Sequence, residues 1–345
     1  MGACTEVNTF SGGDRIKGSY MSGLDASLQS KKLNCKKIPS NLILFVILAV
    51  MVGVFSALSR DFYSYYNIVA ILNNLAFTGI IAAALTLVMI TGGLDMSVGG
   101  NIALTSCMVA AMYNLPNPPN MILVVFIGLL VGVFIGFFNG FLITRLNLNP
   151  VITTLGVMTM ARGGAYVLSK GRSILVMENV TGFLGRGTVA RIPMPLLFFI
   201  LVYMVLAIIL SRSKFGRKVY YIGANPEAAR VSGINSRRIK TILYFLTGIS
   251  ASFSGLILTG MTAAGMPQHG AGTELDIISA VLLGGTALAG GKGSIVGTLA
   301  GVLILAVLYN GFTLIGIKWM PIRVFQGILL VGIVALYEAR GKKRF

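Results

Sequence analysis

The stretch from Asn67 to Tyr113 reads NIVAILNNLAFTGIIAAALTLVMITGGLDMSVGGNIALTSCMVAAMY, and it decides the class of fold. Its one charged residue is Asp95, so a lipid bilayer could accept nearly all of it. As one helix it would be roughly 70 Å long, over twice the hydrocarbon thickness of about 30 Å. The chain must therefore break, and the glycines of GGLDMSVGG, Gly92 to Gly100, let the backbone turn. We expect the Asp95 carboxylate to cap the helix that follows.

Similar apolar runs recur along the whole chain, of which 55% is hydrophobic and 11% charged. Ordinary soluble domains carry roughly 25% charged residues. The runs are continuous and do not alternate with period two, which favours helices over a barrel. The sequence therefore predicts an all-α polytopic membrane protein with about ten transmembrane helices. The expected spans are residues 41–58, 67–90, 96–113, 121–143, 151–168, 195–211, 241–263, 274–290, 294–315 and 320–338.

A second glycine-rich break, GGTALAGGKGS, runs from Gly284 to Ser294. Interrupted spans in corresponding positions of two halves indicate an inverted repeat with the solute path between them, which we hold as a hypothesis. Elsewhere, small residues recur every fourth position and predict close helix packing. They are Gly128, Gly132, Gly136, Gly140, Gly297 and Gly301.

The net charge of +18 follows the membrane topology. With the amino terminus inside, 20 of the 28 Lys and Arg fall in inner segments and six in outer ones, as the positive-inside rule requires. Nucleic acid is excluded as a partner because the cations do not gather on one soluble domain. We expect a basic cytoplasmic tail (1–40), a transmembrane domain (41–338) containing a basic inner segment (212–240), and a basic cytoplasmic C-terminus (339–345).

The sequence lacks the residues of an enzyme or a nucleotide motor. Its one histidine, His269, is expected to be a solvated loop residue, and no metal-ligand cluster or cofactor motif appears. The stretch ending in Gly291, Lys292 and Gly293 fails the phosphate-loop pattern at two positions. A membrane enzyme is therefore the weakest of three functional hypotheses.

Ionisable groups at membrane depth are few, and such groups are normally functional. They are Asp95, Arg162, Glu274, Asp276 and Arg323. An ion-coupled secondary carrier for a small polar solute, the main alternative function, would have only Asp95 or Asp276 to bind its ion. Uncharged polar residues could meet a hydroxyl-rich solute or bond a neighbouring helix. The candidates for the solute path are Asn73, Asn74, Thr91, Asp95, Ser97, Thr153, Thr154 and Asp276.

The basic segment from Arg212 to Lys240 contains a short helix marked by capping signals. Asn225 suits the N-cap, Pro226 the first helical position, and Gly233 the left-handed turn that ends the helix. Such a helix, Pro226 to Ser232, is too short to cross a membrane and could bind a partner at the inner face.

Three segments together resemble one family: GGLDMSVGG, GANPEAARVSGIN and ELDIISAVLLGGTALAGGKGSIVGTLAG. They are similar to the ribose-type sugar permeases of bacterial ATP-binding-cassette (ABC) importers, within the branched-chain amino acid and ribose permease family. The resemblance covers roughly residues 41–338. It implies a permease subunit without cofactor that imports a monosaccharide or a similar solute across the bacterial inner membrane, with both termini cytoplasmic.

The resemblance also implies partners: two ABC ATP-binding subunits, an extracytoplasmic solute-binding protein, and a second permease subunit in a homodimer or heterodimer. The short inner helix would then couple to the ATP-binding subunit. The residues to which this role is carried over are Gly223, Asn225, Pro226, Glu227, Ala228, Ala229, Arg230 and Gly233.

Overall fold

The computed structural model describes residues 40–176 and 182–342, and most of them are helical. Six of its helices are long and apolar enough to cross a membrane: α3 (Tyr65–Ile90), α5 (Met121–Arg145), α6 (Pro150–Ser169), α8 (Met194–Arg212), α11 (Ser236–Thr262) and α13 (Ile295–Leu314). Three more helices carry shorter apolar stretches: α2 (Ser40–Leu58), α4 (Val98–Tyr113) and α14 (Trp319–Lys342). The polytopic helical fold is confirmed. Of the predicted tail, residues 1–39 lie outside the described residues, as do residues 343–345 of the C-terminal segment.

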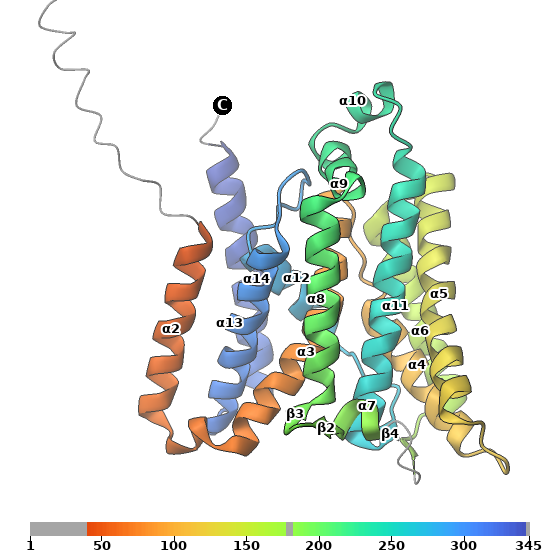
Figure 1. Ribbon diagram of the computed structural model, residues 1–345, viewed down its shortest axis with the longest axis vertical. Coiled ribbons are helices and arrows are strands. Elements are labelled where there is room, and N and C mark those ends of the chain that lie inside the picture. Colours follow the sequence, from red (N-terminus) through yellow and green to blue (C-terminus); the bar gives the residue numbers. More distant parts are fainter. Residues whose placement is uncertain (1–39, 177–181, 343–345) are drawn as a thin grey trace, which may run out of the picture. The chain divides into compact units, whose positions relative to one another are not determined.

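The helices form one bundle with two different ends (Figure 1). At one, which we call the α10 end, lie α9 (Lys214–Ala224) and α10 (Pro226–Val231). At the other, the hairpin end, lie α7 (Gly182–Arg186) and the strands β2 (Thr188–Val189) and β3 (Ile192–Pro193). Helix α2 begins and α14 ends at the α10 end, so within the described residues the chain starts and finishes on the same side (Figure 1).

Helix α3 is the central element of the bundle. From Leu75 to Ile90 all but one of its residues are buried, and it contacts α8, α11, α12 (Thr273–Leu283) and α13. The outer helices instead expose large apolar side chains, among them Val50 of α2, Phe134 of α5 and Val331 of α14. Such a surface is unsuited to water and suited to lipid.

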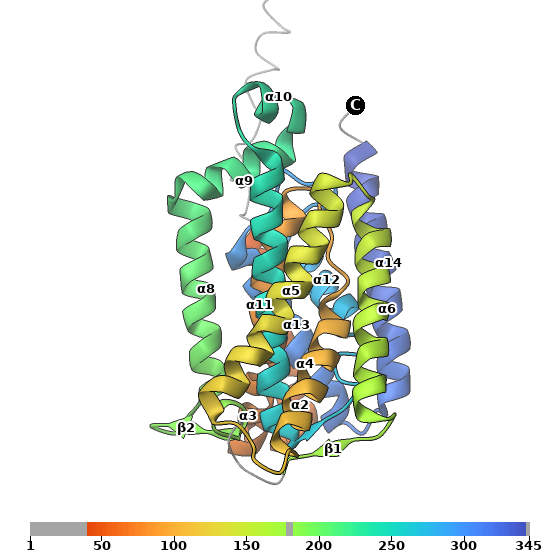
Figure 2. The ribbon, with the colours of Figure 1, turned by 90° about the vertical axis from the view of Figure 1, so that its right-hand side faces the viewer.

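The glycines spaced by four residues pack as predicted. A Cβ at Gly132 would lie 2.3 Å from the carbonyl oxygen of Gly248, and one at Gly136 would lie 2.5 Å from that of Tyr244, both on α11. Figure 1 shows α5 beside α11, and Figure 2 shows α5 crossing in front of it. On α13, a Cβ at Gly301 would lie 2.0 Å from the carbonyl oxygen of Ala280 on α12. These contacts exclude any side chain, so glycine lets the helix backbones touch.

Of the eighth expected span, residues 274–290, only the part up to Leu283 is helical, and the break predicted from Gly284 to Ser294 begins where this helix ends. Helix α12 has 11 residues, about 16 Å, which is half of the hydrocarbon thickness. It ends because Gly285 takes a φ of +93°, a conformation that side chains disfavour. The following segment, up to Ser294, is irregular.

The loops at the hairpin end contain structure that the sequence did not predict. Strand β1 (Ile174–Leu175) pairs antiparallel with β4 (Ala264–Gly265), with Ile174 opposite Gly265. Strands β2 and β3 pair with Val189 opposite Ile192. A 3-10 helix, η1 (Arg60–Tyr63), joins α2 to α3. The β1–β4 pair ties the loop after α6 to the loop after α11.

Candidate functional site

The two glycine-rich breaks, far apart in sequence, lie against one another. The amide of Gly291 donates a 2.8 Å hydrogen bond to the carbonyl oxygen of Ile90, the last residue of α3. A Cβ at Gly290 would lie 2.8 Å from the amide nitrogen of Gly92. A backbone carbonyl at the end of α3 therefore receives its hydrogen bond from the second break. Backbone groups shielded from water need such partners.

Helix α9 reaches the same place from the α10 end. A Cβ at Gly223 would lie 1.8 Å from the carbonyl oxygen of Ile90 and 2.5 Å from the amide nitrogen of Gly291. One turn earlier, the Tyr220 hydroxyl donates a 2.8 Å hydrogen bond to the carbonyl oxygen of Gly293. Burial raises the pKa of Tyr220, so this hydroxyl keeps its proton at neutral pH. Helix α9 thus touches both breaks at once, and we call this contact the α9 junction.

The first break holds a buried polar network. Asp95 Oδ1 accepts from the amide of Ser97 at 2.9 Å and from its hydroxyl at 2.6 Å. The Ser97 hydroxyl also accepts from the side-chain amide of Asn139 at 2.7 Å, and Thr154 Oγ1 accepts from the amide of Met96 at 3.1 Å. Asp95 therefore binds Ser97, the N-cap residue of α4, and not an amide inside that helix as we expected. Its Oδ2 is buried without a hydrogen-bond partner among the described residues.

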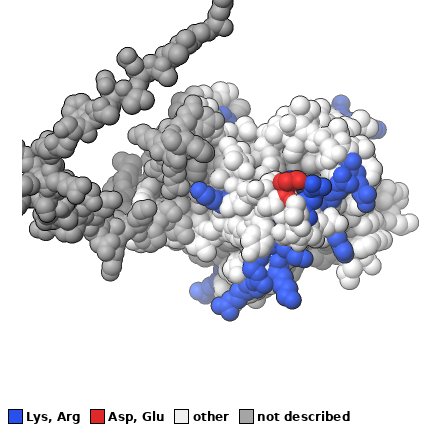
Figure 3. Space-filling view, turned by 90° about the horizontal axis from the view of Figure 1, so that it is seen from above, with Lys and Arg blue, Asp and Glu red and all other residues white. Residues whose placement is uncertain are grey.

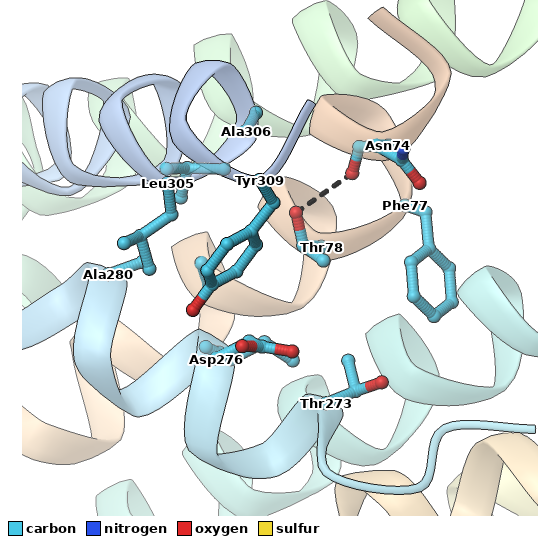
Figure 4. Close-up of a pocket in the computed structure, with 12 residues that line it drawn as sticks. Asn74, Phe77, Thr78, Thr273, Asp276, Ala280, Leu305, Ala306 and Tyr309 are labelled. Atoms are coloured by element: carbon cyan, nitrogen blue, oxygen red, sulfur yellow. Dashed lines mark hydrogen bonds between the residues drawn. The ribbon is translucent and has the colours of Figure 1, made fainter. Parts of the chain in front are cut away.

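A cavity of about 270 Å³ lies between α3, α12 and α13. Its volume is near the lower end of the roughly 300–1,000 Å³ usual for small-molecule sites. Figure 4 shows Asn74 and Thr78 of α3, Asp276 of α12 and Tyr309 of α13 around it, with Phe77 beside them. Its wall combines apolar surface with groups that can bind hydroxyls.

Two polar groups of this wall, the carboxylate of Asp276 and the hydroxyl of Tyr309, are buried and interact with each other. Asp276 Oδ2 is 3.5 Å from Nη1 of Arg323, which compensates the carboxylate charge. A carboxylate oxygen accepts from solute hydroxyls, and a tyrosine hydroxyl can donate or accept. The arrangement suits a small polyhydroxylated solute.

Two arginines hold the loop that leads into α12. Arg162 of α6 donates from Nη2 to the carbonyl oxygen of Gly270 at 3.4 Å. Arg323 of α14 donates from Nη2 to that of Ala271 at 3.0 Å. Glu274, in the first turn of α12, is buried as well, where the positive end of the helix dipole favours a carboxylate. The few charges within spans therefore position the half-helix that carries Asp276.

The predicted path residues divide into separate groups. Asn74 and Asp276 line the cavity, whereas Asp95, Ser97 and Thr154 belong to the network of the first break. The hydroxyls of Thr91 and Thr153 bond to backbone carbonyls of their own segments, Val88 and Asn149. Asn73 does not line the cavity. The structure thus does not bring the predicted residues into one site.

Sequence reasoning missed Thr78, Thr273 and Tyr309, which also line the cavity. Thr78 is one turn from Asn74 and could have been found by helical spacing. Tyr309 gives no such signal, because a lone tyrosine in an apolar span resembles any packing residue.

His269 is not the solvated loop residue that we expected. It is buried, and its Nδ1 lies 2.8 Å from the hydroxyl of Ser106, which in turn accepts from Thr259 at 2.8 Å. The prediction was wrong because the loop after α11 turns back into the bundle against α4.

The short helix α10 has the predicted caps. Asn225 Oδ1 accepts from the amides of Glu227 and Ala228, both at 3.0 Å. Gly233 has a φ of +74°, and the amide of Ile234 donates to the carbonyl oxygen of Ala229, which closes the helix end. The helix stands clear of the bundle, and only Ala229 of it is buried (Figures 1 and 2). Its remaining surface is open.

Comparison with known proteins identifies permeases of transport systems. The family model described as "Branched-chain amino acid transport system / permease component" matches residues 67–334. The ribose import permease protein of Bacillus subtilis (strain 168) is 39% identical over 310 residues, which cover 89% of this chain and 96% of that protein. A probable ABC transporter permease protein of Escherichia coli (strain K12) is 33% identical over 308 residues, which cover 88% and 92%.

A third relative is the L-arabinose transport system permease protein of Escherichia coli (strain K12), 31% identical over 304 residues, which cover 88% of this chain and 91% of that protein. No solved structure matches the chain. The family match spans both glycine-rich breaks, the cavity and α10, so the whole arrangement described above belongs to one kind of protein. The chain is a member of the branched-chain amino acid transport system permease family.

Proposed function

We propose that this protein is the membrane-spanning permease subunit of an ABC importer for a monosaccharide or a similar small solute. Relatives named for the import of ribose and of L-arabinose, both pentoses, support the solute class. The cavity supports it independently, because Asp276 and Tyr309 offer hydroxyl-binding groups beside apolar surface. The solute path would pass from this cavity towards the two breaks.

The observation that carries the proposal is the α9 junction. Helix α10 exposes most of its surface at one end of the bundle, and α9 connects it to both breaks through Gly223 and Tyr220. A partner that moves α10 would therefore move the backbone of the broken spans. The proposed partner is an ABC ATP-binding subunit that binds α10, whose hydrolysis of ATP would drive transport.

Further subunits complete the proposed importer. A second permease chain, identical or homologous, would enclose the path together with this one, and two ATP-binding subunits would lie at their α10 ends. An extracytoplasmic solute-binding protein would deliver solute at the hairpin end, where α7 and the β2–β3 hairpin lie. The transmembrane domain would comprise residues 41–338, between basic cytoplasmic segments at 1–40 and 339–345.

The proposed topology has ten crossings in the bacterial inner membrane, with both termini in the cytoplasm. Nine are made by α2, α3, α4, α5, α6, α8, α11, α13 and α14. The tenth would combine half-helix α12 with the irregular segments before and after it. Basic residues gather at the α10 end, as expected of a cytoplasmic face (Figure 3). In a cysteine-free background, a cysteine at position 343 should resist an impermeant thiol reagent in intact cells, whereas one at position 172 should react.

Vesicle uptake tests the function directly. The purified chain is reconstituted with its ATP-binding subunit and binding protein, and accumulation of labelled ribose and L-arabinose is measured. Uptake of at least one sugar should require both ATP and the binding protein. Uptake by the permease alone, driven by a proton or sodium gradient, would show a secondary carrier instead.

A further inference from the structure

A groove at the α10 end gathers three arginines, none of which has an acidic partner among the residues that the structure describes. Arg145 is the last residue of α5, and Arg237 and Arg238 lie in the first turn of α11. They line one groove of about 670 Å³ together with Asn235, whose side chain caps α11. The ion pairs found among residues 40–176 and 182–342, Glu227 with Arg230 and Asp276 with Arg323, lie elsewhere. Within the described part of the chain, the positive charge of the groove is therefore uncompensated.

Beneath the arginines the groove becomes apolar. Phe141 and Phe137 lie four and eight residues before Arg145 on α5, about 6 and 12 Å deeper along the helix, and both are more than 40% exposed. Ile242 continues the apolar surface on α11. Between the two zones lie the hydroxyls of Thr144 and Thr241, 3.0 Å apart. From its rim inward, the groove presents cations, then hydroxyls, then hydrocarbon. Polarity decreases with depth in the same order at a membrane surface.

The walls of this groove are held rigidly. A Cβ at Gly140 would lie 3.0 Å from the Cα of Thr241, and one at Gly136 would lie 2.5 Å from the carbonyl oxygen of Tyr244. Because α5 and α11 touch by backbone just below the arginines, the backbone positions of the three arginines are fixed relative to one another before any ligand arrives. Preorganisation of this kind reduces the entropy lost on binding.

We propose that this groove binds one anionic phospholipid, whose phosphate lies among Arg145, Arg237 and Arg238 and whose acyl chain runs over Phe141 and Phe137. Arginine matches phosphate through bidentate hydrogen bonds. Free phosphate would use the arginines but not the aromatic surface. The acidic surface of a water-soluble protein could not reach Phe137, which lies in the apolar span of α5. A lipid satisfies both zones at once, whatever solute the protein transports.

The test measures lipid retained by the purified chain. Protein extracted in mild detergent is titrated with phosphatidylglycerol or phosphatidylcholine, and bound lipid is counted by native mass spectrometry. The groove variant replaces Arg145, Arg237 and Arg238 by glutamine. The control variant makes the same change of charge at the same end, outside the groove, with glutamine at Arg212, Arg217 and Lys218, all exposed.

Wild type and control should bind one phosphatidylglycerol tightly, and the groove variant should bind it roughly a hundredfold more weakly. Each near-surface cation contributes a factor of about five towards anionic lipid. Phosphatidylcholine should bind weakly to all three proteins, and inorganic phosphate should not displace the lipid. The variant Phe141→Ser keeps every cation and should still weaken binding, because the acyl chain loses its contact.

Four results would overturn the proposal. Equal lipid binding by the groove variant and wild type would show that the arginines hold no lipid. Equal loss in the control variant would show a diffuse surface effect. Displacement of the lipid by inorganic phosphate, or loss of the ATP-binding subunit without loss of lipid, would assign the groove to a soluble anion or to a protein.

Discussion

Replacing Gly223 by alanine tests the α9 junction in its simplest form. The added Cβ would lie 1.8 Å from the carbonyl oxygen of Ile90, the last residue before the first break, and 2.5 Å from the amide nitrogen of Gly291 in the second break. A real Cβ keeps at least 3.0 Å from such atoms, so α9 or a break must move by about 1.2 Å. Neither contact is with a flexible side chain, so no rotamer change can relieve it. Overpacking of this kind costs about 1–3 kcal/mol.

If transport requires α9 and the breaks to come into this contact, the cost appears in the transport equilibrium. A shift of 1–3 kcal/mol corresponds to a factor of about 5–150 in the population of the contacted state. Uptake of sugar by the reconstituted importer should therefore fall by that factor. Co-purification of the ATP-binding subunit should remain, because α10 itself is unchanged. The assay combines uptake, ATP hydrolysis stimulated by the loaded binding protein, and subunit stoichiometry.

Gly163→Ala is the matched control. Gly163 lies in helix α6, and a Cβ there meets no atom within 4 Å. This substitution should be neutral or stabilise the helix by about 0.5–1 kcal/mol. Tyr220→Phe gives a graded version, since it removes only the hydrogen bond to Gly293, worth about 0.5–1.5 kcal/mol. Uptake by Gly223→Ala equal to that of Gly163→Ala would refute the coupling role of the junction.

Three further sets of substitutions test the cavity, the first break and α10. Asp276→Asn should raise the half-saturating solute concentration in uptake about tenfold, because a charge-assisted hydrogen bond is worth about 1.5–3 kcal/mol. The control Asp61→Asn, at an exposed residue, should leave this concentration unchanged. Equal uptake curves for Asp276→Asn and Asp61→Asn would exclude the cavity from the solute path. Asp95→Asn keeps an acceptor for Ser97, whereas Asp95→Leu leaves the buried donors of Ser97 unpaired, which costs about 1–3 kcal/mol of stability. The Asn variant should therefore retain more uptake and a higher Tm. A similar loss in both variants would show that these hydrogen bonds are not the reason Asp95 matters. The double exchange Glu227→Arg with Arg230→Glu keeps an ion pair within α10 but reverses the order of the two charges on its exposed surface. Membrane insertion should persist, whereas the ATP-binding subunit should no longer co-purify. Retained co-purification would show that α10 does not bind that subunit.

The helical class and the positions of the breaks follow from local composition. Long apolar runs leave a helix as the only way to satisfy the backbone in lipid, and an uncharged stretch twice as long as a span must turn where glycines allow it. The caps of α10 are equally local, because Asn225 and Gly233 act on backbone atoms within four residues. Each of these predictions therefore needed no knowledge of the rest of the chain.

The extent of α12 and the environment of His269 could not be predicted in this way. The expected span 274–290 runs past the start of the predicted second break, but the helix ends at Leu283, and the segment after it bonds to the end of α3. His269 looked solvated, but its loop folds back against α4 and places the ring beside Ser106. In both places a contact with a segment more than 100 residues away decides the local structure.

The sequence by itself determined that this protein is a bundle of membrane helices with two glycine-rich interruptions and a capped helix at one end. Only the tertiary structure decided that the interruptions meet, that Gly223 touches both, and that Asp276 and Tyr309 face one cavity. The physical reason is that hydropathy and capping act over a few residues, whereas the close approach of backbones depends on the shapes of both surfaces. A glycine in the sequence indicates that a close approach is possible there, but not which segment makes it.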